Sequence, residues 1–197
     1  MRIKILIAAI AILILAPMAA RAIDQATIDR MVFLLQQPEW NGWGDAVFDD
    51  LTLYDGLLAI YANAVNNGDG PLLRKVIWAM GETHMAAFAP TVIGVLPDEP
   101  VAACMALGKI PSEDSVDALI DSLSDDDPQV RDAAAWGLGN LPYDSNLAPV
   151  RDQAISALDA QKQEETESWV RERISGAVDM IQTGISTSAA FQRGMSE

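Results

Sequence analysis

The chain is poor in the residue types from which catalytic, metal and disulfide sites are usually built. Among its 197 residues there is one cysteine, Cys104, and one histidine, His84. A single cysteine excludes an intrachain disulfide, so the fold has to depend on its apolar core. A single histidine falls short of ordinary metal-ligand spacing, and nothing around it resembles a known nucleophile motif. A glycine-rich phosphate loop and a calcium-binding Asp loop are also missing, so the sequence predicts neither an enzyme nor a cofactor.

Positive charge is scarce as well. Lys and Arg together number 13 against 28 Asp and Glu, which gives a formal net charge of −15. Nucleic-acid phosphates would be repelled by such a chain, and so would an anionic membrane surface. The same charge favours a cationic or neutral partner.

The N-terminus has the pattern of a signal peptide over residues 1–22. A short cationic start, Met1 to Lys4, precedes an apolar run from Ile5 to Ala16, and Ala20-Arg21-Ala22 offers the small residues that a signal peptidase requires. The apolar run is shorter than the roughly 20 residues that span a bilayer. We therefore expect a mature chain that begins at Ile23 and is periplasmic or secreted, with an uncleaved membrane anchor as the alternative.

A degenerate repeat occupies the rest of the chain. Its strongest copy, Asp127 to Leu141, has an acidic turn, a proline at the helix start and a small-residue helix up to Gly139. Weaker copies are Gly70 to Thr83, Pro97 to Ile110 and Trp169 to Ile181. Between the copies, segments with apolar residues at helical spacing predict second helices at Ala86 to Leu96, Ser115 to Leu123 and Leu147 to Leu158.

Proline and glycine recur at fixed places in these copies. A proline in the first turn of a helix removes an N–H that is unpaired anyway, which explains Pro71, Pro100 and Pro128. Near the other end, Gly81, Gly108 and Gly139 are expected to stop each helix and turn the chain. The fourth copy carries Asp179 where this glycine is expected.

The segment DPQVRDAAAWGLGNL, residues 127–141, resembles a HEAT repeat of the short type found in phycobilisome-lyase-like proteins. The resemblance implies an all-α fold, a right-handed α-solenoid of helix pairs, over residues 70–183. Residues 23–69, with helices expected at 24–37 and 45–66, would form an N-terminal helical cap, since terminal repeats are atypical. Residues 184–197 are small and polar, and we expect a flexible C-terminal tail there.

Three large apolar residues recur at one position of successive copies. At about 100° per residue, Val130, Ala134, Leu138 and Leu141 form the core stripe, and Trp136 lies nearly opposite. Met105 and Trp78 take the same position as Trp136 in the two preceding copies. In proteins of the resembled type this position lies on the concave, ligand-contacting surface, so these three residues are candidate binding residues.

Polar residues are expected to flank this row of large apolar side chains. The remaining candidate binding residues are Arg74, Lys75, Lys109, Asp132 and Asn140. The partner predicted for the surface is a protein or peptide, possibly cationic, bound by a monomeric scaffold or adaptor. The alternative is that the large apolar residues pack on one another and the flanking residues are ordinary solvated surface.

Other functions stay open at this point. Relatives of the resembled type handle bilins, and an apolar groove would suit a tetrapyrrole, although those relatives act in the cytoplasm. Met80, His84, Met85, Cys104 and Met105 are the one cluster of soft ligands, which suggests a copper chaperone, but Met80 and Cys104 fall on core positions. In the loop 38–44, Trp40 and Trp43 either stack on a ligand or pin the loop to the cap.

Export gives a direct prediction. Mass spectrometry of the native protein should find a chain cleaved after Ala22 and beginning at Ile23, because the cationic start, apolar run and small residues match the needs of signal peptidase. An intact Met1 on a membrane-bound product would contradict the assignment.

Overall fold

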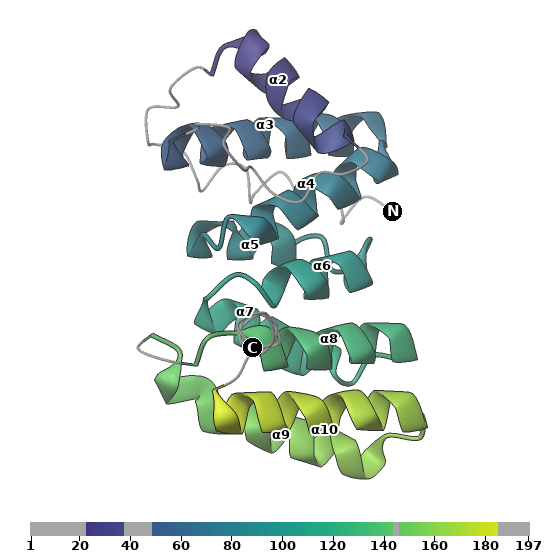
Figure 1. The fold of residues 1–197 in the computed structure, drawn as a ribbon. Helices are drawn as coiled ribbons and strands as arrows, with labels where there is room; N and C mark the ends of the chain where they lie inside the picture. Colours follow the sequence, from purple (N-terminus) through teal and green to yellow (C-terminus); the bar gives the residue numbers. More distant parts are fainter. Residues whose placement is uncertain (1–22, 38–48, 144–145, 185–197) are drawn as a thin grey trace, which may run out of the picture.

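The computed structural model describes residues 23–37, 49–143 and 146–184. These residues are helical with short connections, and they form one elongated stack that runs from α2 at one end to α10 at the other (Figure 1). The expected signal peptide, the loop with Trp40 and Trp43, and the tail beyond Gly184 lie outside the described residues. No helix in the described ranges is long and apolar enough to cross a membrane.

Two helices precede the repeats. They are α2 (Gln25–Gln36) and α3 (Asp50–Asn67), and each begins after an aspartate whose carboxylate accepts a backbone N–H of the first turn. The α3 helix ends at Gly68, whose left-handed φ of 64° terminates the helix at little steric cost. Helix α3 packs on α4, and α2 packs on both, so this pair covers one end of the stack.

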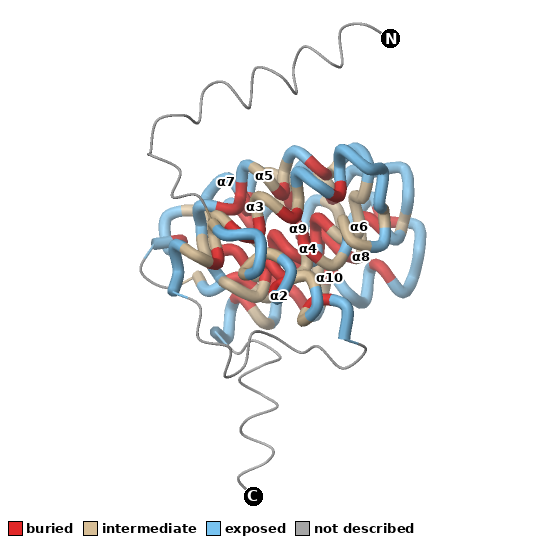
Figure 2. Tube along the Cα trace, turned by 90° about the horizontal axis from the view of Figure 1, so that it is seen from above, coloured by how far each residue is buried: buried red, intermediate tan, exposed pale blue. Residues whose placement is uncertain are grey.

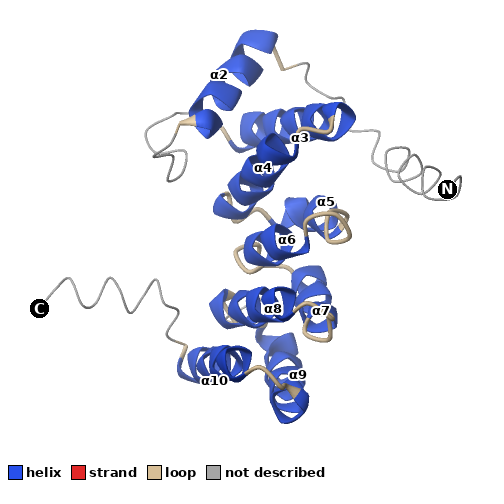
Figure 3. Cartoon of the chain, turned by 90° about the vertical axis from the view of Figure 1, so that its right-hand side faces the viewer, coloured by secondary structure: helices blue, strands red, loops and turns tan. Residues whose placement is uncertain are grey.

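The repeats form two layers of helices. The first helices of successive pairs are α4 (Gly70–Glu82), α6 (Pro100–Leu107), α8 (Pro128–Asn140) and α10 (Ser168–Thr183). The second helices are α5 (Ala89–Ile93) after the short turn η1 (Ala86–Phe88), α7 (Glu113–Ser122), and α9 (Arg151–Glu164) after η2 (Ala148–Val150). Within each layer every helix packs on the next, and Figure 3 shows the two rows side by side. The predicted all-α solenoid is confirmed.

The core lies between the two layers. Viewed along the stack, buried residues line the interior and exposed residues form the periphery (Figure 2). The predicted core stripe of α8 is confirmed, because Val130, Ala134, Leu138 and Leu141 are all buried. The three prolines also lie where the sequence placed them, in the first turns of α4, α6 and α8.

The role predicted for the three repeat glycines is wrong for Gly81 and Gly139, whereas Gly108 does end its helix. Gly81 and Gly139 lie inside α4 and α8, and Gly108 follows α6 with an ordinary right-handed φ of −62°. Positive φ values among the described glycines occur at Gly68 and Gly184. Gly81 and Gly139 therefore do not turn the chain, and Gly108 ends α6 without a left-handed conformation.

The glycines instead allow neighbouring first helices to touch backbone to backbone. A Cβ atom on Gly108 would lie 2.4 Å from the Cα of Gly137, far closer than side chains tolerate. Added Cβ atoms on Gly81 and Gly139 would lie 3.0 Å from the Cα atoms of Ala106 and Ala177. Each of the first three repeats thus presents a glycine that meets a small residue of the next repeat.

This contact also explains the exception in the fourth copy. Asp179 occupies the glycine position in α10, the last described helix, and it is exposed. Because no described helix packs beyond α10, a large polar side chain is tolerated at this position.

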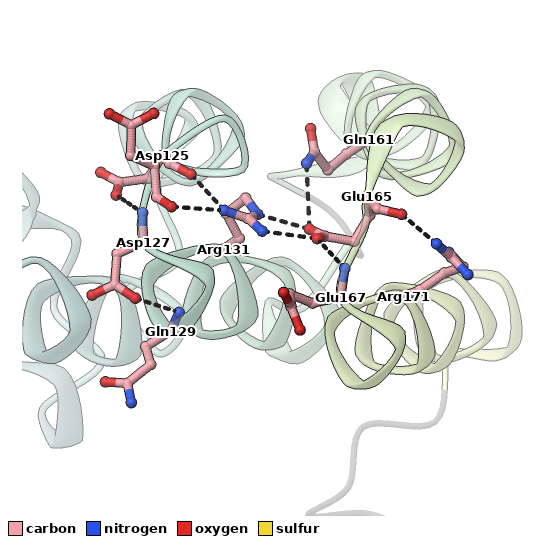
Figure 4. A network of polar contacts seen from close by, with 9 residues as sticks. Asp125, Asp127, Gln129, Arg131, Gln161, Glu165, Glu167 and Arg171 are labelled. Atoms are coloured by element: carbon pink, nitrogen blue, oxygen red, sulfur yellow. Dashed lines mark hydrogen bonds and ion pairs between the residues drawn. The ribbon is translucent and has the colours of Figure 1, made fainter.

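Ion pairs join successive repeats as well. Arg131 of α8 makes a two-pronged pair with Glu165, from Nε to Oε2 at 2.7 Å and from Nη2 to Oε1 at 2.8 Å. The Glu165 side chain is 0% exposed and that of Arg131 is 12% exposed. Glu165 also accepts the backbone N–H of Glu167 at 2.9 Å, which fixes the start of α10 (Figure 4). This buried, bidentate geometry is the strong form of an ion pair.

The same arginine position is reused in the next copy. Arg131 donates through Nη1 to the backbone carbonyls of Asp125 and Asp126, in the turn before its own helix. Arg171, which matches Arg131 in the repeat, donates to the backbone carbonyl of Glu165. Both guanidinium groups therefore tie a first helix to the turn that precedes it.

Substituting the tightest glycine should destabilise the fold. Gly108→Ala forces backbone apart where α6 meets α8, and we expect the free energy of unfolding to fall by about 1–3 kcal/mol, as for other overpacked sites. Gly176→Ala is the matched control, because its Cβ meets nothing within 4 Å and alanine favours a helix by up to about 1 kcal/mol. Urea unfolding of both variants tests this, and an unchanged Gly108→Ala would contradict the assigned contact.

Because of the buried ion pair, the free energy of unfolding should fall at acidic pH. The hydrogen bonds from Arg131 lower the pKa of Glu165 from its ordinary 4.5 to about 2. Because the folded pKa is the lower one, the carboxylate stabilises the fold fully above about pH 4.5 and loses this contribution as the pH falls toward 2.

Glu165→Gln isolates this contribution. At neutral pH it should lower the free energy of unfolding by about 3–5 kcal/mol, because it leaves Arg131 without its buried partner. The difference from wild type should shrink through the same acid window, measured by urea unfolding. Glu113→Gln, at an exposed position on α7, serves as the control, and an equal loss in both variants would contradict the account.

Candidate functional site

The first-helix layer carries a groove on its outer surface. It has a volume of about 410 Å³ and crosses three successive first helices, α6, α8 and α10. Its lining residues are Val101, Met105, Gln129, Asp132, Ala133, Trp136, Trp169 and Arg173. Five of these eight are apolar or aromatic, so the groove is mostly apolar, with Gln129, Asp132 and Arg173 as its polar lining residues.

Three predicted binding residues meet in this groove. Met105 from α6 and Trp136 from α8 take the same position in consecutive repeats, and both line the hollow beside Asp132. Met105 is 44% exposed, which is high for a large apolar side chain. Trp136 is half-buried. The prediction that this position faces outward is therefore correct for these two copies.

The third member of the predicted row, Trp78, lies apart from the groove. The Nζ atom of Lys109 lies 5.7 Å from the centre of the Trp78 ring, a cation–π arrangement. The same ammonium group pairs with Glu82, one turn further along α4. Lys109 therefore covers the Trp78 ring, and the continuous row of three residues expected from the sequence is interrupted between α4 and α6.

A tryptophan that the sequence analysis did not select, Trp169 of α10, lines the groove, whereas the expected Trp78 of α4 does not. Trp169 is the second residue of α10, is 44% exposed, and lines the hollow together with Trp136. The position in α10 that corresponds to Trp136 holds Gly176, with open space around it. Sequence analysis missed Trp169 because it matches Gln129, not Trp136, in the repeat.

The remaining predicted polar residues divide between structural contacts and other surfaces. Arg74 pairs with Glu99 at 2.7 Å, which joins α4 to the start of α6. Asp132 pairs with Arg173 at 2.9 Å, across the groove from α8 to α10.

The other two predicted polar residues lie outside the groove. Lys75 lies on α4 and is half-buried. Asn140 lies at the far end of α8, where its side chain donates to the carbonyl of Trp136 at 2.8 Å.

Asn140 lines a second hollow of about 380 Å³ between the C-terminal ends of α8 and α10. Arg151 lies in this hollow and donates to the last carbonyls of α10, those of Ile181 and Gln182. The Tyr143 hydroxyl is buried there without a hydrogen-bond partner in the described part of the chain, and burial raises its pKa. Arg151 therefore caps the C-terminal end of α10 in this hollow, which is separate from the groove.

The soft-ligand cluster is divided between the core and the surface. Met80 and Cys104 are 0% exposed, and burial raises the pKa of the Cys104 thiol to about 11. Such a thiol stays protonated near neutral pH and is a poor metal ligand. The Nδ1 atom of His84 is 2.8 Å from the carbonyl oxygen of Lys109. Among the described residues, no group of three His, Cys, Asp or Glu side chains is arranged to hold a metal ion.

The architecture is that of an α-solenoid with a groove on one layer. Residues 97–177, from the turn before α6 into α10, match the family of HEAT repeats. The part of the chain that carries the groove is therefore similar to HEAT repeats. A search of curated proteins found no match.

Proposed function

We propose that this protein is an exported interaction scaffold, periplasmic or secreted, which binds a protein or peptide on the outer surface of its first-helix layer. The observation that carries the proposal is the groove across α6, α8 and α10, where Met105 and Trp169 are exposed beside Trp136. Large apolar side chains on a soluble surface often mark interaction sites. Tryptophan is also enriched among the residues that contribute most to binding energy.

The rigidity of the stack supports this role. The first helices touch through glycine and alanine contacts, and ion pairs link α4 to the start of α6 and α8 to α10 and the turn before it. The groove residues are therefore held on helices of a fixed frame, which reduces the entropy lost when a partner binds. HEAT repeats commonly mediate protein interactions, and stacked repeats of this kind present extended binding surfaces.

A bilin-handling function is the second candidate, because the groove volume falls within the roughly 300–1,000 Å³ common for small-ligand sites. The charges favour it less. Tetrapyrroles of this kind carry carboxylates, whereas Arg173, the one cation that lines the groove within the described ranges, is already paired with Asp132. A visible absorption band in the purified protein would support this second candidate over the scaffold.

Truncating the groove tryptophans should weaken binding far more than folding. Once a partner has been captured from the native envelope fraction, Trp136→Ala and Trp169→Ala should each lose on the order of 2 kcal/mol of affinity, as hot-spot residues do. Phe33→Ala is the control, because Phe33 is 62% exposed on α2, outside the groove.

Calorimetry of binding and thermal unfolding of each variant give the two quantities. If Trp136→Ala and Trp169→Ala unfold early and the remaining folded protein binds its partner normally, the tryptophans serve packing and the proposed site is wrong.

A further inference from the structure

The groove lies at one particular end of the helices that form it. Val101, Gln129 and Trp169 line its border, and each is the second residue of its own helix, α6, α8 and α10 respectively. The opposite border is formed one to two turns later, by residues such as Met105 and Trp136. One border of the groove therefore adjoins the N-terminal ends of three consecutive first helices.

Carboxylates stand in a row beside that border. Exposed acidic residues precede the three helices. They are Asp98 before α6, Asp125, Asp126 and Asp127 before α8, and, before α10, Glu167 in the turn and Glu164 at the end of α9. These acidic residues recur before each successive first helix, so they are arranged along the axis of the stack. An apolar groove thus runs beside an acidic row of the same length.

The nearby cations offset this row only in part, although Arg131 lies close enough to attract Glu167 and Asp125 electrostatically. Arg131 directs its guanidinium to the buried carboxylate of Glu165 and to backbone carbonyls of the acidic turn, so it bonds no exposed carboxylate of the row. Arg173 pairs with Asp132, and Arg74 pairs with Glu99. With a net charge of −15 over the chain and exposed carboxylates concentrated in this row, we expect a negative potential at this border.

We propose that the groove binds a basic, amphipathic segment of another protein, lying along the stack across α6, α8 and α10. This inference rests on the proposed function and names the chemistry of its partner. Apolar side chains of the segment enter the hollow between Met105, Trp136 and Trp169. Lysine or arginine side chains on its other edge face the acidic row, where they gain from charge complementarity and from faster association.

The spacing between the first helices sets the minimum length of the bound segment. Packed helices lie about 8–10 Å apart, so contact with three helices demands a segment that spans two such intervals. A single side chain or a small cation does not span this length, whereas an extended peptide at about 3.3 Å per residue does so within six or seven residues.

Short labelled peptides test the inference on the purified protein by fluorescence anisotropy. The probes are a peptide in which Lys and Leu alternate, one with Glu and Leu, and one with Lys and Ser. We expect the Lys–Leu peptide to bind most tightly, because it alone supplies both apolar anchors and positive charge. Trp169→Ala and Trp136→Ala should each weaken it by about tenfold or more, while Phe33→Ala should leave it unchanged.

Charge variants separate the acidic row from the general negative charge. Asp126→Asn combined with Glu167→Gln should weaken the Lys–Leu peptide by about threefold at low salt and flatten the salt dependence of binding. Asp114→Asn combined with Asp121→Asn removes the same charge from exposed positions of α7, in the other layer, and should have little effect. Equal losses in the two double variants would overturn the inference.

The outcomes also distinguish this inference from the proposed function. If the Glu–Leu peptide binds as tightly as the Lys–Leu peptide, and both depend on Trp136 and Trp169, the groove is a binding site but the inferred partner chemistry is wrong. If the tryptophan variants affect neither peptide binding nor capture of the native partner, the proposed function fails as well. Self-association that is lost in Trp169→Ala would make a second copy of this chain the occupant, and would likewise overturn the inference.

Discussion

The arrangement of this protein depends on backbone contact between successive first helices. Gly108 meets Gly137 so closely that a single added carbon would lie 2.4 Å from the opposing Cα, and the equivalent contacts on either side use glycine against alanine. Such contacts bring α4, α6, α8 and α10 into one tightly packed layer. Because every repeat uses the same contact, the same outward position recurs from helix to helix, which is how Met105 and Trp136 come to line one groove.

Positive charge is scarce in this chain, and most of the arginines near the repeat contacts form ion pairs between repeats. Arg74, Arg131 and Arg173 are each engaged by a carboxylate of a neighbouring repeat. Positive charge is thus used to hold repeats together, and the carboxylates left over dominate the surface. The Arg131–Glu165 pair (Figure 4) is the most buried of these ion pairs, and it connects the strongest copy of the repeat to the fourth copy.

The sequence predicted the helices and the core because both depend on local patterns. Proline in the first turn, aspartate before it and apolar residues at helical spacing placed the starts and inner faces of α4, α6 and α8, and correctly placed Cys104 inside. The role of Gly81 and Gly139 was misjudged, and the close contact of Gly108 was missed, because a glycine at a helix end and a glycine at a helix crossing look alike in sequence. Their distinction depends on the neighbouring helix.

The site was predicted in part for a related reason. Repeat alignment compares equivalent positions, so it found Met105 and Trp136, but it overlooked Trp169, which reaches the same groove from a different position of α10. It also joined Trp78 to the row, because it contained no information that Lys109 extends back across that ring. Alignment thus identifies a recurring outward position, whereas the groove depends on which side chains from neighbouring helices converge.

Photo-crosslinking from position 105 tests the central claim, that a partner lies on the outer face of the first-helix layer. A photoreactive amino acid in place of Met105 should, on irradiation in the native compartment, yield a discrete crosslinked species with one partner. The same amino acid in place of Asp121, exposed on α7 in the opposite layer, should yield none. Crosslinking from position 121 with none from position 105 would contradict the account.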